Sequence, residues 1–206
     1  MVITFPHMGN IYFAAKALFD DLQIDYVIPP LSSKSSLEIG SLHSPEEMCL
    51  PFKIMIGNYM HAIEKGADTI IITGSCGPCR FGEYCELQMN LLSKLGHKLD
   101  FVVVDSPGDI GVQELFSRLG RISQSSSLPK AKKLKALSNA VKVVRLIDEI
   151  EAKARYQAGF EKNKGECKGL LRACKEEAMT AQTGDDMLRI LNRYKKQLES
   201  LPLAMA

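Results

Sequence analysis

The sequence predicts an α/β fold: a three-layer Rossmann-like domain with a mostly parallel sheet, followed by a helical C-terminal extension. Three observations lead to this prediction. Short apolar runs alternate with amphipathic segments through the first two-thirds of the chain, and the connections between them are short. Beyond that, apolar residues recur only at helical spacing. We therefore expect an α/β domain over residues 1–122, a linker over 123–129 and a basic helical extension over 130–206.

Four short apolar runs are the predicted strands. The first two are MVITF, residues 1–5, and IDYVIP, residues 24–29, which ends in proline. The third, DTIIIT at 68–73, is almost entirely apolar, as is typical of a parallel strand buried on both faces. The fourth is LDFVVVD at 99–105.

Helical periodicity predicts helices between and after these strands. Pro45 suits the opening turn of one of them and Gly66 its exit, whereas Pro51 marks a break or a second start. The predicted helices span 11–22, 35–42, 44–66, 83–95, 108–120, 130–157 and, with an interruption at 183–186, 170–198.

The composition limits the class of protein. Of the 206 residues, 46% are hydrophobic and 24% charged, which is typical of a globular chain. No apolar run approaches the roughly 20 residues that cross a bilayer, and the first residues lack the pattern of a secretion signal. We expect a cytoplasmic protein without membrane contact, in which the 6 cysteines form no structural disulfides.

Charge divides the chain unequally. Residues 1–127 contain 9 Lys and Arg against 14 Asp and Glu, whereas residues 128–206 contain 17 against 10. The basic part has few aromatic residues and no nucleic-acid motif, so we do not expect it to bind nucleic acid. Docking on a protein partner or a solvated helix face are the two alternatives.

A cysteine-rich stretch follows the third predicted strand. Residues 74–85 read GSCGPCRFGEYC and include Cys76, Cys79 and Cys85. The loops that follow parallel strands emerge at one edge of a sheet, where ligands bind. Cys49 lies near the start of the helix leading into that strand, so the fold allows it to face Cys76 and Cys79.

Three chemistries fit these cysteines, and a further alternative is that they are structural residues that bind no ligand. The pair Cys76 and Cys79 has the spacing of a thiol–disulfide oxidoreductase, but no tryptophan precedes it and Cys49 and Cys85 are surplus to a dithiol. Four thiolates would also suit zinc, although structural zinc usually joins two Cys-x-x-Cys pairs and only one is present. An iron–sulfur cluster accepts scattered thiolates, and the spacing favours it over zinc.

Three segments of the chain carry a resemblance to a known family. FPHMGNIYFAAKALFDDL, CLPFKIMIGNYMHAIEKGAD and GSCGPCRFGEYCELQMNLL, in this order, resemble the acyl-CoA dehydratase activase-related proteins. That group is related to the 2-hydroxyglutaryl-CoA dehydratase subunits. The resemblance covers roughly residues 1–120, and its specific parts lie at Cys49 and at 76–81.

The resemblance implies a cluster of the [4Fe-4S] type held by Cys49, Cys76 and Cys79, with Cys85 as a fourth ligand or an unused residue. It also implies low-potential electron transfer or dehydratase-type reductive chemistry, anaerobic and linked to ATP hydrolysis. The chain has no P-loop, so we expect the ATPase to be a partner. That partner would be an ATP-hydrolysing activator or a second dehydratase-like subunit, in a homo- or hetero-oligomer.

Other functions and residues complete the expectations. The rivals to the cluster are a metal-binding or scaffold module that docks on a partner, and a dithiol enzyme using Cys76 and Cys79. His7 and Asn10 follow the first predicted strand, and Arg80 adjoins Cys79. His7 would donate a hydrogen bond to a ligand or tie down its loop, and Asn10 would bind a ligand or cap a helix. Arg80 would offset the negative charge of a cluster or face solvent.

Overall fold

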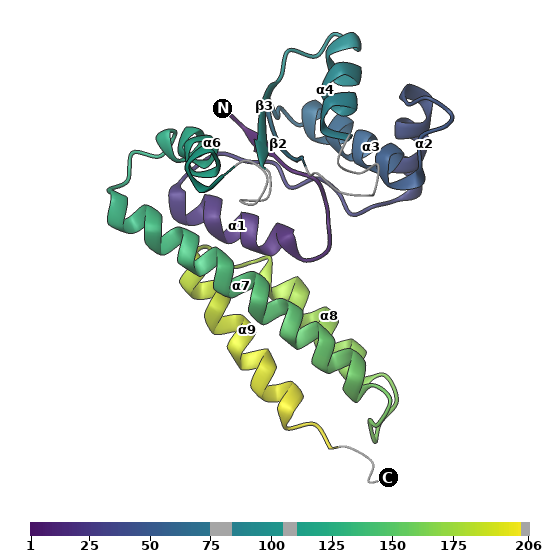
Figure 1. The fold of residues 1–206 in the computed structure, drawn as a ribbon. Coiled ribbons are helices and arrows are strands. Elements are labelled where there is room, and N and C mark those ends of the chain that lie inside the picture. Colours follow the sequence, from purple (N-terminus) through teal and green to yellow (C-terminus); the bar gives the residue numbers. More distant parts are fainter. Residues whose placement is uncertain (75–83, 105–110, 203–206) are drawn as a thin grey trace. The chain divides into compact units, whose positions relative to one another are not determined.

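The computed structural model describes residues 1–74, 84–104 and 111–202 (Figure 1). It confirms an α/β fold, in which helices predominate and the described strands form a parallel sheet. The strands are β1 (Ile3–Thr4), β2 (Thr69–Thr73) and β3 (Asp100–Val104). The helices are α1 (Ile11–Leu22), α2 (Lys34–His43), α3 (Leu50–Glu64), α4 (Tyr84–Lys94), α6 (Val112–Gln124), α7 (Lys130–Gln157), α8 (Glu166–Ala178) and α9 (Gly184–Glu199).

The described strands follow the order β1-β2-β3, with every pair parallel. The predicted strand at 24–29 is reduced to one parallel bridge, between Tyr26 and Ile3. The amide N–H of Ile3 donates a hydrogen bond to the carbonyl oxygen of Asp25 at 3.0 Å. The amide N–H of Val27 donates one to the carbonyl oxygen of Ile3 at 2.7 Å. Two prolines follow at once and lack the N–H groups that a longer ladder requires. The segment therefore adjoins β1 on the side away from β2.

Two compact units make up the chain. We call Met1–His7 with Ile24–Ser127 the sheet unit, and Met8–Gln23 with Leu128–Ala206 the helical unit. The expected α/β domain included residues 8–23, but α1 clusters with the C-terminal helices. The reason is packing: Phe13 and Ala17, one turn apart on α1, join the apolar core of the helical unit.

In the sheet unit, one apolar cluster joins α3, β2 and α4. Its buried members are Phe52, Met55, Ile56, Tyr59, Ile70, Ile72, Tyr84 and Leu92. Figure 1 draws α3 and α4 on one side of the strands and α6 on the other. On the α6 side, the Arg121 guanidinium pairs with the carboxylate of Asp100 at 2.7 Å.

Local sequence explains where α2 and α3 begin. The Ser33 hydroxyl accepts the amide hydrogen of Ser36 at 3.2 Å and caps α2. Helix α3 starts at Leu50 with Pro51 in its first turn, where a missing N–H costs nothing. Pro51 is thus a helix start, the second of the two alternatives. Gly66, with φ +94°, follows the helix end.

The helical unit is built from α1, α7, α8 and α9. The predicted helix at 130–157 matches α7, and the predicted interruption near 183–186 falls at the start of α9. There the Thr183 hydroxyl accepts the amide hydrogen of Asp186 at 3.1 Å. No helix in the described part of the chain is long and apolar enough to cross a membrane.

Candidate functional site

The register of the sheet determines which loops meet at its carboxyl edge. Thr4 of β1 lies opposite Ile70 of β2. His7 comes three residues after Thr4, and Gly74 comes four residues after Ile70. The two strands are parallel neighbours, so the segment at His7 and the segment that leads to Cys76 leave the sheet at the same edge.

Cys49 occupies the N-cap position of α3, with extended backbone at φ −69° and ψ 161°. Its side chain is exposed and does not cap the helix. The first turn of α3 contains no acidic residue. Free amide groups and the helix dipole therefore favour a negatively charged group beside this thiol.

Tyr84, the first residue of α4, is the polar partner of Cys49. Its hydroxyl is in hydrogen-bond contact with the Sγ of Cys49, although the two residues are 35 positions apart. The Tyr84 ring is buried and stacks edge-on against Phe52 of α3, with centroids 5.0 Å apart. The packing of α3 against α4 thus fixes the hydroxyl at Cys49.

Cys85 follows Tyr84 on α4. It is half-buried and packs against the apolar cluster of the sheet unit. Met48, directly before Cys49, packs against the same cluster. The sheet unit therefore brings the segment at Cys49 and the start of α4 to one apolar cluster, as a shared site requires.

Cys76, Cys79 and Arg80 lie outside the described residues. Among the residues that are described, no three His, Cys, Asp or Glu side chains are grouped so as to hold a metal ion. The convergence of Cys49 with Cys76 and Cys79 accordingly stays a prediction.

His7 is half-buried in the segment after β1. Burial lowers its pKa below the ordinary 6.5, and a hydrogen bond with its own backbone opposes this in part. The imidazole is therefore neutral at pH 7 and carries one N–H donor and one acceptor. A neutral ring fits either expected role, as a hydrogen-bond donor to a ligand or as a tie within the loop.

Asn10 belongs to the helical unit and stands at the N-cap position of α1. Its side chain makes no capping bond. The amide nitrogen instead donates to Asp148 Oδ1 and to Glu151 Oε2, both at 2.8 Å. The two amide hydrogens thus connect α1 to α7, a contact that its sequence position did not indicate.

A groove of about 410 Å³ lies between the start of α3 and one face of α4. Met48 and Phe52, which flank Cys49 in the sequence, contribute to its wall. The side-chain amide of Asn90 and the ammonium group of Lys94 lie among its apolar side chains. The lining residues are Pro45, Met48, Phe52, Leu87, Asn90, Leu91 and Lys94.

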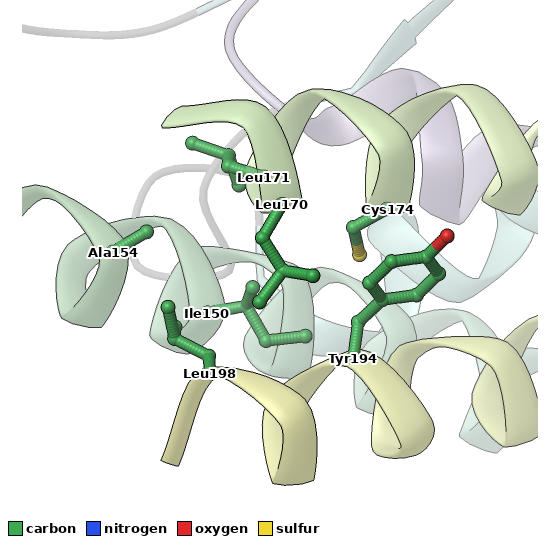
Figure 2. Close-up of a pocket in the computed structure, with 7 residues that line it drawn as sticks. All are labelled: Ile150, Ala154, Leu170, Leu171, Cys174, Tyr194 and Leu198. Atoms are coloured by element: carbon green, nitrogen blue, oxygen red, sulfur yellow. The ribbon is translucent and has the colours of Figure 1, made fainter. Parts of the chain in front are cut away.

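The two remaining cysteines are packing residues. Cys167 and Cys174, seven positions apart on α8, are both fully buried in the core of the helical unit. Figure 2 shows the Cys174 sulfur beside the ring of Tyr194, among apolar side chains of α7, α8 and α9. Burial, followed by the nearby Glu177 carboxylate, raises the pKa of Cys174 to about 11. Such a thiol is protonated at neutral pH and is a poor ligand or nucleophile.

Sequence reasoning missed Tyr84 as a site residue. The pattern assigns it only to a helix beginning near residue 83, because no motif links a tyrosine to a cysteine 35 positions earlier. The available signal was its position, directly beside Cys85 and five residues after Cys79.

Comparison with known proteins does not identify a family for this chain. No protein-family model matches the chain, and no curated protein matches it.

Proposed function

We propose that the chain is an iron–sulfur protein in which Cys49, Cys76 and Cys79 hold the cluster and Cys85 is the candidate fourth ligand. It would serve ATP-linked, low-potential electron transfer or dehydratase-type reductive chemistry within a larger cytoplasmic assembly. The observation that carries the proposal is the contact between Cys49 and Tyr84. That contact places an exposed thiol at the first described residue after the Cys-x-x-Cys segment.

Chain connectivity supports the convergence of the cysteines. Cys76 follows Gly74, at the carboxyl end of β2, by two residues, so their Cα atoms are at most about 7 Å apart. Cys79 precedes Tyr84 by five residues, which limits that separation to about 18 Å. Cys79 is thereby tied through a short segment to the residue whose hydroxyl contacts Cys49.

The groups around Cys49 fit a negatively charged cluster. The helix start of α3 offers unpaired amide hydrogens and no acidic side chain in its first turn. When Cys49 is a thiolate, the Tyr84 hydroxyl is the donor in their contact, and it then orients the sulfur and stabilises its charge. Phe52 and Met48 reduce water access from one side. A cluster bound here supplies one-electron transfer.

The proposal also includes a three-layer Rossmann-like arrangement of the sheet unit. With the bridge at Tyr26, the parallel order becomes 24–29, β1, β2, β3. The strand order reverses between β1 and β2, because 24–29 is added on one side of β1 and the later strands are added on the other. This is the order of a doubly wound, three-layer Rossmann-like domain, and the reversal is where such folds bind ligands. The segments that contain His7 and Gly74 follow β1 and β2, the two strands between which the order reverses.

Anaerobic reconstitution with iron and sulfide tests the function. We expect a brown protein with about four irons and four sulfides per chain. Cys76→Ser and Cys49→Ser should each lose most of the iron and the visible absorption, because each removes a thiolate ligand. The matched control is Cys174→Ala, which removes a thiol buried in the helical unit and should keep the full iron content.

Other results would point to the rival functions. One zinc per chain and no sulfide would indicate a structural metal site and a scaffold role. A metal-free protein that reduces disulfides through Cys76 and Cys79 would indicate a dithiol enzyme. Equal iron loss in Cys174→Ala and Cys76→Ser would show that the iron is not bound at the proposed ligands.

A further inference from the structure

Helix α7 has a second apolar face that the helical unit does not use. Its inner face is formed by buried residues that include Ala136, Val143 and Ile147. A separate row runs along the same helix at spacings of three and four. Its apolar members are Leu134, Leu137, Val141 and Val144, the first three of which are 69%, 38% and 42% exposed. We call these four residues the outer row.

The outer row is distinct from the inner face by helix geometry. At 100° per residue, the row is centred about 125° around the helix from the inner face. Spacings of three and four over four positions are those of a short coiled-coil seam. A surface helix of a globular protein normally has one apolar stripe and a polar opposite face. A second stripe on an exposed part of α7 indicates a partner.

Charges of opposite sign end the outer row. One helical turn before Leu134 stands Lys130, and one turn after Val144 stands Asp148, both on the line of the row and both exposed. Asp148 accepts one hydrogen bond, from Asn10, and has further lone pairs available. The row is therefore positive at one end, apolar in the middle and negative at the other end.

We propose that the outer row is a homodimer interface, in which α7 of one chain packs antiparallel on α7 of a second copy. A two-fold axis near Asn139 places Leu134 opposite Val144 and Leu137 opposite Val141. The same axis places Lys130 of each copy opposite Asp148 of the other. A parallel pair would bring Lys130 against Lys130 and Asp148 against Asp148, which is repulsive.

The other basic residues between Lys130 and Asp148 do not oppose this pairing. Lys132, Lys135 and Lys142 lie more than about 120° around the helix from the row. Lys135 is also paired with Asp185 of α9 at 2.5 Å. The axis near Asn139 places Arg145 level with Lys133 of the second copy. At 100° per residue the two lie on opposite edges of the row, so they do not face each other. A second copy is thus the occupant whose charges match the row.

Few side chains take part, so the interface belongs to the small, weakly associating class. The test is sedimentation equilibrium of the full chain, with reductant present, over a wide concentration range. We expect a reversible monomer–dimer equilibrium. Leu137→Ser, which places a hydroxyl in the centre of the row, should abolish the dimer. A chain that stays monomeric at every concentration would overturn the proposal.

Charge exchange tests the antiparallel register. Lys130→Glu places Glu opposite Asp148 at both ends of the dimer, so its dissociation constant should rise about tenfold. The double variant Lys130→Glu with Asp148→Lys should restore the dimer, because the two ends are again complementary. Lys132→Glu is the matched control and should have little effect. Failure of the double variant to restore association would overturn the register.

Discussion

At the scale of single residues, Glu151 shows how the helical unit holds a charge in its interior. Its side chain is 16% exposed and accepts hydrogen bonds from Asn10 of α1 and, at 2.6 Å, from Lys175 of α8. Burial acts to raise its pKa, but the bonds from Lys175 and Asn10 and the nearby cations outweigh it. The pKa falls from 4.5 to about 2. The carboxylate thus joins three helices.

The lowered pKa predicts a dependence of stability on pH. The folded state favours the ionised form, so its contribution is complete above pH 4.5 and is lost as pH falls through about 2. We expect Glu151→Gln to lower the free energy of unfolding by about 1–2 kcal/mol near neutral pH, because the group is partly solvated. Well below pH 2 the variant and the wild type should be equally stable.

Denaturant unfolding followed by circular dichroism at several pH values measures this. The control is Glu176→Gln, since Glu176 on α8 is 73% exposed and its partner Arg172 is 4.0 Å away. Its effect should be small at every pH. An effect of Glu151→Gln that does not diminish in acid would show that its charge is not the stabilising feature.

At the scale of elements, two glycines allow α2 and α3 to pack closely. A Cβ on Gly40 of α2 would lie 1.6 Å from the carbonyl oxygen of Lys53 on α3. A Cβ on Gly57 of α3 would lie 1.8 Å from the carbonyl oxygen of Ser36 on α2. At each glycine, the missing side chain allows the backbone of the other helix to approach closely.

Gly57→Ala should therefore be strongly destabilising. The added methyl group would meet a backbone atom, which cannot rotate away, so we expect a loss of at least about 3 kcal/mol, at the upper end for overpacked cores. Gly169→Ala in α8 is the matched control. It has nothing within 4 Å and should gain about 0.5–1 kcal/mol, because alanine favours helix. Equal melting temperatures for the two variants would contradict the close packing.

Periodicity predicted most elements but not their partners. The runs at 68–73 and 99–105 became β2 and β3 within a residue or two, because their apolar character is continuous. The run at 24–29 has a similar composition but forms a single bridge, because its prolines end the ladder. The close packing through Gly40 and Gly57 has no local signal, since a helical glycine alone does not identify its neighbour.

At the scale of the whole molecule, the N-terminal helix α1 completes the C-terminal helical unit. Phe13 is fully buried in that unit's core with Val143 and Ile147 of α7. Asp21 accepts the amide hydrogen of Gly184 at 2.8 Å, which caps the start of α9. The amphipathic pattern of 11–22 predicted a helix, but nothing in it specified packing against residues more than 100 positions away.

Phe13→Ala should therefore destabilise the helical unit, by about 3–5 kcal/mol. Hydrogen exchange read by mass spectrometry should show faster exchange in α7 and α9 than in the wild type, with a smaller change in α3. The control is Tyr156→Ala on α7, where the side chain is 71% exposed and the effect should be slight. Faster exchange confined to residues 24–74 would contradict the assignment of α1 to the helical unit.

The candidate site was predictable in part. The spacing of Cys76 and Cys79 is visible in the sequence, and the expectation that Cys49 lies at a helix start is met by its N-cap position on α3. The contact of Cys49 with Tyr84 could not be foreseen, because it depends on how α3 packs against α4. That packing is also what makes a shared site for the cysteines physically reasonable.

Cross-linking of the metal-free, reduced protein tests the convergence of Cys49 with Cys76 and Cys79 most directly. A short bifunctional thiol reagent such as dibromobimane joins only sulfurs that approach closely, and peptide mass spectrometry identifies the joined pair. We predict a product that links Cys49 to Cys76 or to Cys79. A product in which Cys76 and Cys79 are joined to each other, while Cys49 carries only a single-ended adduct, would contradict the proposed site.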